Sequence, residues 1–342
     1  MKIVVLAGGT STERDVSLVS GKQIYSALKK AGHDVVLLDV FLGLKTDDID
    51  SVFKRGDELL LNIDNIKEQN PDINAVKALR PDADSEFFGP NVIDICKKAD
   101  VVFMGLHGEN GENGKVQAAF DLHGIRYTGN DYISSALAMD KDLSKDLFRF
   151  YDIKTPESYT LKKGETDDHT PKYPVVVKVT DGGSSIGVYI VHNDEEYKKA
   201  KESAFFYGNE VLVEKFVDGR EFSVGVIKGK ALPVIEIKPK EGFYDYKNKY
   251  QEGSTLETCP AELSDDKTKE VQKMAEDVYR ALRLNQYARI DIMMDHEGEI
   301  YALEANTLPG MTPMSLMPQE AAAAGMSYID FCEKIISIAM EK

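Results

Sequence analysis

The first forty residues carry the pattern that most restricts how this chain can fold. A β-branched apolar run at Ile3–Leu6 ends at the glycine pair Gly8-Gly9, and a stretch with one apolar helical face follows. Gly32 ends that stretch, and a second apolar run covers Val35–Val40. Strand, glycine turn, helix and strand in this order are typical of a parallel α/β unit, because parallel strands need a crossover connection. We therefore expect an α/β fold that begins with an open parallel sheet.

The later segments predict further strands and one hairpin. Apolar runs at Val175–Val179 and Val188–Val191 flank a glycine-serine loop, and Arg289–Met294 and Glu299–Leu303 flank a short turn. Residues 265–284 show a helical apolar face. Residues 41–90 are polar and weakly periodic, so we expect an irregular connection with one short helix there and assign it no function.

Composition and charge limit the possible partners. The 342 residues suffice for two or three domains. The 42 basic and 58 acidic side chains leave a net charge of −16, which repels phosphodiester backbones, so we expect no nucleic acid partner. Cys96, Cys259 and Cys332 fit neither a disulfide framework nor a metal spacing, as in a reducing compartment. We see neither a signal peptide nor an apolar stretch of membrane-spanning length, and we expect a cytoplasmic protein without a membrane partner.

The last predicted hairpin carries the clearest chemistry. Glu304 and Asn306 are two residues apart on one strand and so share a face, and the neighbouring strand can bring Asp291 alongside. Two carboxylates and an amide are hard oxygen ligands suited to Mg²⁺ that bridges nucleotide phosphates. A solvated strand end would fit the same three residues.

Several other segments suggest anion or amine binding. The loop Gly182–Ser185 offers backbone N–H groups and hydroxyls to phosphate, with Lys178 on the preceding strand, although a surface turn fits too. Glu13 follows the first glycine turn and is suited to an ammonium group, and it also fits an exposed first helical turn. His107 precedes a glycine-rich loop, where a structural role is an alternative. Arg289 lies in an apolar strand and needs an anion, either a structural carboxylate or a ligand.

Together with further short segments, they occur in a characteristic order along nearly the whole chain except residues 41–90. They are 8–18, 107–114, 134–141, 177–178 with 183–187, 214–216 with Gly219 and Glu221, 243–246 with Lys249 and Tyr250, 289–291, and 303–312 with Ser315 and Leu316. Together they resemble the D-alanine–D-alanine ligase family of the ATP-grasp superfamily. That family joins two D-alanines with ATP through an acyl phosphate, for peptidoglycan precursors.

The resemblance implies a nucleotide site with two Mg²⁺ ions, or Mn²⁺ in their place. Its phosphate contacts would be Lys141, Lys178, Lys249, Ser184 and Ser185. The adenine would lie against Glu214, Lys215, Phe216, Phe243, Met293 and Leu303, and the ribose against Glu221. The metal ligands would be Asp291, Glu304 and Asn306.

The resemblance also implies two amino-acid subsites. Glu13 would take the first ammonium, and His107 would lie near the first carboxylate. Arg289 and the N–H of Gly310 would stabilise the tetrahedral oxyanion. Ser315 would bind the second carboxylate, and Tyr250 would help close a lid over the second subsite.

Four positions depart from the usual family pattern. Val179 replaces a common proline, Gly182 a common glutamate, Asn113 a common aspartate, and Phe216 a frequent tryptophan. None of the four is a metal ligand, a phosphate lysine or the oxyanion arginine. Gly182 predicts a looser phosphate loop, and Asn113 changes hydrogen bonds behind the site.

The fold that the resemblance implies has three α/β domains. Residues 1–128 would form the N-terminal parallel sheet, and 129–213 and 214–342 the two lobes of an ATP-grasp fold, in a homodimer. A ligase that takes D-serine or D-lactate as second substrate is an alternative, although Tyr250 favours an amine acceptor. An ATP-grasp ligase with other substrates and a nucleotide binder without catalysis are the remaining alternatives.

Overall fold

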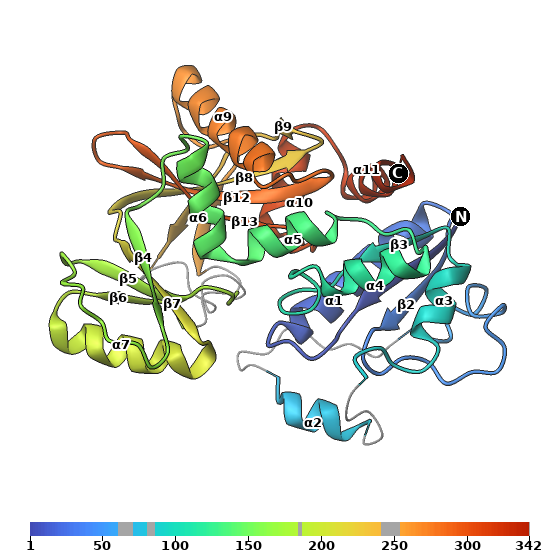
Figure 1. Ribbon diagram of the computed structural model, residues 1–342. Helices are drawn as coiled ribbons and strands as arrows, with labels where there is room; N and C mark the ends of the chain where they lie inside the picture. Colours follow the sequence, from blue (N-terminus) through green and yellow to red (C-terminus); the bar gives the residue numbers. More distant parts are fainter. Residues whose placement is uncertain (61–70, 81–85, 184–186, 241–253, 342) are drawn as a thin grey trace. The chain divides into compact units, whose positions relative to one another are not determined.

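The computed structural model describes residues 1–60, 71–80, 86–183, 187–240 and 254–341 (Figure 1). Contacts within the chain divide it into two compact units. The first unit contains Met1–Ile133, Asn285–Ala288 and Thr307–Lys342, and the second contains Ser134–Leu284 and Arg289–Asn306. The predicted three domains divide the chain differently, since they assign residues 307–342 to the last lobe, and that finer division stays a prediction.

A buried parallel sheet forms the centre of the first unit, as the sequence predicts. Its strands β1 (Lys2–Ala7), β2 (Asp34–Asp39) and β3 (Val101–Met104) pair in the order β2-β1-β3. Ile3 lies opposite Val35 on one side and Val101 on the other, and all three side chains are fully buried. Near-continuous apolar strands of this kind are typical of a parallel sheet covered on both faces.

Helices from both ends of the chain pack in the first unit (Figure 1). They are α1 (Arg14–Lys30), α3 (Val92–Lys98), α4 (Lys115–His123), α10 (Leu316–Ala323) and α11 (Tyr328–Met340). The short α2 (Ile73–Ala78) also belongs to this unit but buries no side chain, and α5 (Tyr132–Met139) links the units along the chain. α1 contacts β1 and β2, and α11 contacts α1 and β3. The apolar face of α11, with Phe331, Ile335 and Ile336, is buried in these contacts. The short α2 is the one predicted within residues 41–90.

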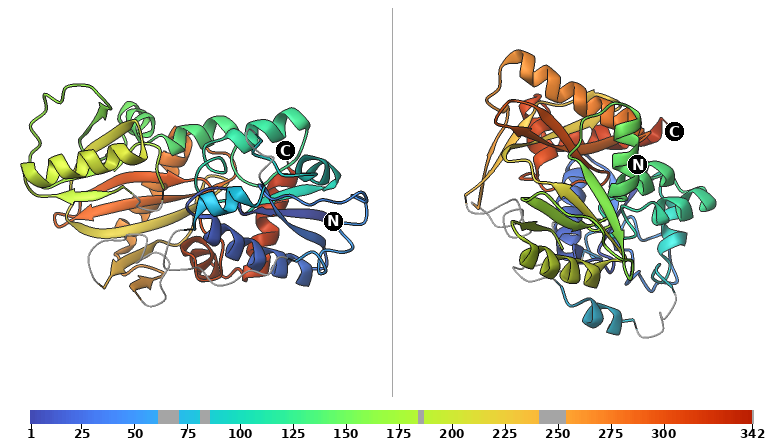
Figure 2. Two further views of the ribbon diagram at one scale, coloured as in Figure 1. Left: turned by 90° about the horizontal axis from the view of Figure 1, so that it is seen from below. Right: turned by 60° about the vertical axis from the view of Figure 1, so that its left-hand side comes forward.

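The second unit contains an antiparallel sheet with one covering helix. The strands β4 (Ser158–Lys162), β5 (Val175–Val179), β6 (Tyr189–Val191) and β7 (Glu210–Lys215) pair in the order β4-β7-β5-β6. The helix α7 (Asp194–Tyr207) packs along this sheet (Figure 2), and Tyr197, Ala200 and Ala204 bury its apolar side.

A second sheet of this unit carries the predicted hairpin. Its strands are β8 (Gly219–Ile227), β9 (Lys230–Ala231), β10 (Ile235–Pro239), β11 (Thr255–Thr258), β12 (Tyr287–Asp295) and β13 (Ile300–Asn306). Their order is β11-β10-β8-β12-β13, with β9 paired to β8. The helix α9 (Asp265–Ala281) packs against β8 and β13, and α6 (Lys141–Phe150) contacts α9. β12 and β13 form the antiparallel hairpin expected from the sequence.

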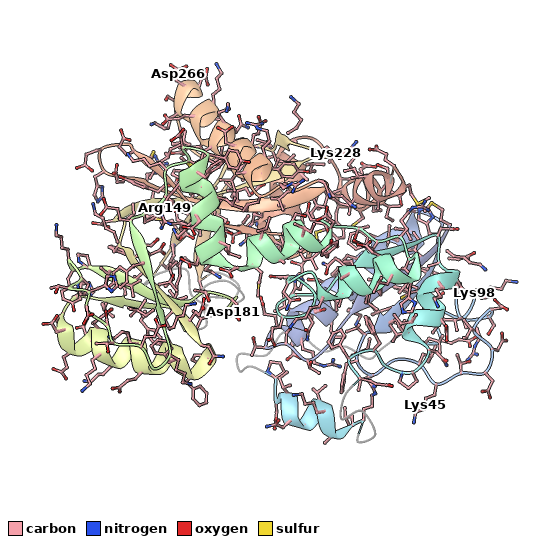
Figure 3. The ribbon with its side chains drawn as sticks, in the orientation of Figure 1. Lys45, Lys98, Arg149, Asp181, Lys228 and Asp266 are labelled. Atoms are coloured by element: carbon pink, nitrogen blue, oxygen red, sulfur yellow. The ribbon has the colours of Figure 1, made fainter. Side chains whose placement is uncertain are left out.

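Charged side chains lie on the surface of both units, because burying an unpaired charge is costly. Figure 3 labels six of them, and all six are exposed: Lys45, Lys98, Arg149, Asp181, Lys228 and Asp266. Within the described ranges, no helix is both long and apolar enough to cross a membrane.

Candidate active site

The second unit contains a cavity of about 790 Å³. The residues around it come from both sheets of that unit and from the start of α6. They include ten side chains predicted for nucleotide and metal binding, namely Lys141, Lys178, Glu214, Lys215, Phe216, Glu221, Asp291, Met293, Leu303 and Glu304. Apolar groups such as Val176, Ile190 and Ile237 line it as well, so it offers both an apolar surface for a planar base and charges for phosphates.

A bulge in the last hairpin brings consecutive residues to one cavity. Consecutive residues of a regular strand point to opposite faces. The register of β12 and β13 shifts after Asp291, so that Asp291 lies opposite Glu304 while Ile292 lies opposite Ala302. Leu303 is the extra residue, and Leu303 and Glu304 both line the cavity.

The predicted metal ligands lie together on this hairpin. Asp291 is directly opposite Glu304, and Asn306 is opposite Arg289. Asp291 accepts two bonds from the Arg289 guanidinium, at 2.9 and 2.8 Å, and a third from the Ser223 hydroxyl at 3.0 Å. The predicted anion for Arg289 is thus a carboxylate of its own strand. Among the described residues, no three or more His, Cys, Asp or Glu side chains are grouped to hold a metal.

Two predicted phosphate lysines contact carboxylates of the same unit. Lys141, the first residue of α6, lies 3.6 Å from Glu304 and donates to the Gly182 carbonyl at 2.6 Å. Lys178 on β5 lies 2.5 Å from Glu214 on β7. Burial alone would lower the pKa of Lys178, but the carboxylates of Glu214 and Glu304 raise it overall.

A buried lysine that the sequence patterns do not single out contacts the same carboxylate. Lys145 on α6 lies 2.8 Å from Glu214 and donates to the Thr155 hydroxyl at 2.6 Å. Burial opposes ionisation of Glu214, but Lys145 and Lys178 outweigh it and lower its pKa from 4.5 to about 2. The spacing of Lys141 and Lys145, one helical turn apart, is the one sequence signal that points to Lys145.

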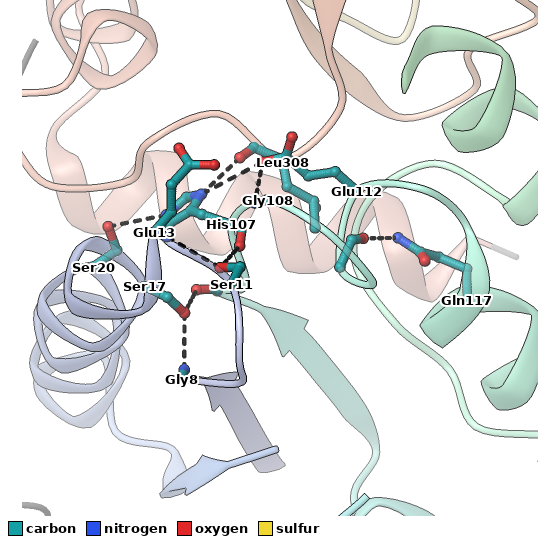
Figure 4. A network of polar contacts seen from close by, with 12 residues as sticks. Gly8, Ser11, Glu13, Ser17, Ser20, His107, Gly108, Glu112, Gln117 and Leu308 are labelled. Carbon is teal, nitrogen blue, oxygen red and sulfur yellow. Dashed lines mark hydrogen bonds and ion pairs between the residues drawn. The ribbon is translucent and has the colours of Figure 1, made fainter. Parts of the chain in front are cut away.

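The first unit contains a second cluster of predicted residues, around the loop that follows β3 (Figure 4). Glu13 is buried at the start of α1, and its side chain does not cap that helix. The Ser11 hydroxyl donates to the His107 carbonyl at 2.6 Å and accepts from the Glu13 N–H at 3.2 Å. Gly108 has φ +75°, a backbone conformation that favours glycine, and a Cβ there would lie 2.9 Å from a Glu13 carboxylate oxygen.

His107 and Tyr328 hold the turn that contains Gly310. The His107 Nδ1 lies 2.9 Å from the Leu308 carbonyl, and its Nε2 lies 3.3 Å from the Ser20 hydroxyl. Tyr328 of α11 donates to the Met311 carbonyl at 2.6 Å. These two contacts lie on either side of Gly310 and restrict the direction of its N–H.

Ser315 closes the same turn. It is the N-cap residue of α10, but its hydroxyl makes no capping bond and instead contacts Thr312, at 3.2 Å from the N–H and 2.9 Å from Oγ1. A Cβ at Gly310 would lie 2.9 Å from the Ser315 hydroxyl, so this close approach requires glycine.

Two family models match the chain over most of its length. The model for the D-ala D-ala ligase N-terminus matches residues 2–130, and the model for the D-ala D-ala ligase C-terminus matches residues 147–337. The chain belongs to the D-alanine–D-alanine ligase family. The resemblance predicted from the sequence is confirmed, and the structure agrees with the expected α/β fold.

Individual members of the family are similar over their full length. The D-alanine–D-alanine ligases of Pediococcus pentosaceus and Lacticaseibacillus casei are each 44% identical to this chain over 98% of it, and over 97% and 95% of their own lengths. A crystal structure of the Bacillus anthracis ligase complexed with ATP has a TM-score of 0.75 and 30% identity, covering 100% of this chain and 98% of that one. The Coxiella burnetii ligase structure has the same TM-score at 25% identity, over 100% of this chain and 94% of that one.

Five of the residues predicted from the family pattern lie outside the described residues. They are Ser184, Ser185, Phe243, Lys249 and Tyr250. Their predicted roles in phosphate, adenine and lid contacts stay predictions.

Proposed function

We propose that this chain joins two D-alanine molecules to D-alanyl-D-alanine at the expense of ATP. The observation that carries the proposal is the gathering of ten predicted nucleotide and metal residues around one cavity in a chain of this family. A carboxylate is a poor electrophile until it is phosphorylated, so the first D-alanine attacks the γ-phosphorus and becomes an acyl phosphate. The amine of the second D-alanine then attacks that carbonyl carbon and expels phosphate.

The second unit binds the nucleotide in this proposal. Phe216, Met293 and Leu303 contact the adenine, and the Glu214 carboxylate accepts from its amino group. Glu221 accepts from the ribose hydroxyls, and Lys141 and Lys178 turn from their carboxylate partners to the phosphates.

Two Mg²⁺ ions, when bound, would neutralise phosphate charge, held by the oxygen ligands of Asp291, Glu304 and Asn306. The donor set fits such ions, because two carboxylates and an amide gather on one hairpin. The carboxylates now contact Arg289 and Lys141, cations that the metal ions would replace as partners. Arg289, on the same hairpin, would stabilise the oxyanion of the tetrahedral intermediate.

The first unit supplies contacts to the amino acids. Glu13 takes the ammonium group of the first D-alanine, His107 orients the carboxylate, and the Gly310 N–H donates to the oxyanion. Ser315 holds the carboxylate of the second D-alanine. We extend the proposal to a cytoplasmic homodimer that makes peptidoglycan precursors, as the family resemblance implies.

Phosphate release tests this proposal. The purified chain is incubated with ATP, Mg²⁺ and either D-alanine, D-serine, D-lactate or L-alanine. The released phosphate is measured, and the products are identified by mass spectrometry. We expect release that depends on D-alanine, with the dipeptide as product. Mixed products with D-serine or D-lactate would reassign the second subsite, and release without any D-amino acid would overturn the proposal.

A further inference from the structure

Lys145 is a charged side chain buried completely inside the second unit. Its side chain has 0% exposure, whereas neighbouring positions of α6 such as Arg149 are exposed. A lysine is almost never buried to this degree unless it is paired. Burial lowers its pKa despite the opposing effect of Glu214. Burying an ammonium group costs desolvation free energy, so we expect Lys145 to have a function that an apolar side chain could not perform.

Two lysines contact Glu214 through different oxygens. Lys145 lies 2.8 Å from Oε2, and Lys178 lies 2.5 Å from Oε1. Lys178 lines the cavity together with Glu214, whereas Lys145 is absent from the described residues around it. Lys145 therefore approaches the carboxylate from the protein interior and Lys178 from the cavity.

Thr155 fixes Lys145 in place. Its hydroxyl accepts from Lys145 at 2.6 Å and donates to the Ala302 carbonyl at 2.8 Å. Ala302 in turn donates its N–H to the Lys154 carbonyl at 2.8 Å. The ammonium group of Lys145 is thereby joined to β13 directly before Leu303 and Glu304, two residues of the cavity.

We infer that Lys145 is a positioning residue that sets the nucleotide preference of the cavity by keeping Glu214 ionised and oriented. The inference rests on the proposed function, because that function has Lys178 turn to the phosphates and Glu214 accept from the adenine amino group. When Lys178 leaves, Lys145 remains as the partner of Oε2, and Oε1 stays an anionic acceptor. Without Lys145, Glu214 either retains Lys178 or takes up a proton. A protonated Glu214 donates to a 6-oxo group, so a hypoxanthine nucleotide becomes a better ligand.

The test compares ATP with ITP, which has a 6-oxo group where ATP has the amino group. Calorimetric titration of the full chain with each nucleotide and Mg²⁺ measures dissociation constants without any ligation step. We expect Lys145→Met to lower the preference for ATP over ITP by about tenfold or more, because a site built for hydrogen bonding discriminates through correctly paired groups. The Michaelis constant for D-alanine should stay within about twofold, since the substitution leaves the first unit unchanged.

Lys154→Met is the matched control. Lys154 lies 2.6 Å from Glu299 in an exposed ion pair, so its loss should leave the ATP-to-ITP preference unchanged. If Lys145→Met does not fold, Thr155→Val replaces it, because that change keeps the lysine and removes the hydroxyl that fixes it. A preference equal to that of the unsubstituted chain in the folded variant would overturn the inference. Because the ATP-to-ITP preference is obtained from binding alone, a chain that failed to ligate D-alanine would refute the proposed function without affecting this comparison.

Discussion

At the scale of single residues, the site consists of opposite charges that are paired with one another. Asp291 is paired with Arg289, Glu304 with Lys141, and Glu214 with Lys145 and Lys178. Removing one partner of a buried pair leaves an uncompensated charge, which costs more than the pair itself contributes. We therefore expect the loss of each charge to have its own effect on stability or on ligation.

Glu214→Gln should lower the free energy of unfolding at pH 7 by about 3–5 kcal/mol, because it leaves two buried lysines without their carboxylate. The pKa of Glu214 is lowered to about 2 in the folded chain, from 4.5. Its stabilising contribution is therefore complete above pH 4.5 and is lost as the pH falls toward 2. Urea unfolding of both chains at several pH values measures this, and a difference that did not shrink below pH 4.5 would contradict it.

Arg289→Ala should reduce D-alanine-dependent phosphate release by about 10²–10³-fold, because the oxyanion loses a charged donor. Its effect on the ATP dissociation constant should be much smaller, since Ser223 still donates to Asp291. Steady-state kinetics and calorimetry measure the two quantities. A variant that lost ATP affinity as strongly as ligation would assign Arg289 to the nucleotide.

At the scale of elements, α11 holds the turn that contains Gly310, the residue whose N–H we propose as an oxyanion donor. The Tyr328 hydroxyl donates to the Met311 carbonyl, next to Gly310. Tyr328→Phe should lower kcat by up to about tenfold through loss of that hydrogen bond, with the Michaelis constant for ATP unchanged.

Tyr25→Phe is the control for this prediction. Tyr25 also lies in the first unit and donates from its hydroxyl to Asp57, so its substitution removes a comparable hydrogen bond far along the chain from that turn. Equal losses of kcat in the two variants would indicate a general effect on stability and would remove Tyr328 from the positioning of Gly310.

The sequence predicts the elements of the site better than their exact geometry. The pairing of Asp291 with Glu304 follows from the predicted hairpin, because two adjacent strands with a short turn must pair. The bulge at Leu303 has no local sequence signature, since it depends on packing of both strands. Lys145 is likewise inconspicuous, because a lysine on an amphipathic helix is ordinarily solvated, and only the fold reveals its burial beside Glu214.

At the scale of the whole molecule, the chain forms two units that are each built from distant segments. Residues 307–342 pack with the N-terminal sheet through α11, although residues 134–306, nearly all of them in the second unit, lie between the two segments along the chain. Such long-range packing cannot be predicted from local periodicity, because it depends on contacts between segments far apart in the sequence. The described residues predicted to bind the nucleotide nonetheless all lie in the second unit.

In the proposed reaction, this chain activates a D-alanine carboxylate as an acyl phosphate. The most direct test supplies ATP, Mg²⁺ and D-alanine labelled with ¹⁸O in its carboxylate, and weighs the released phosphate and the dipeptide. We expect one ¹⁸O atom in each phosphate, because the attacking carboxylate oxygen bonds to phosphorus and leaves with it when the amine attacks. Unlabelled phosphate, or phosphate release that does not depend on D-alanine, would rule out the acyl phosphate.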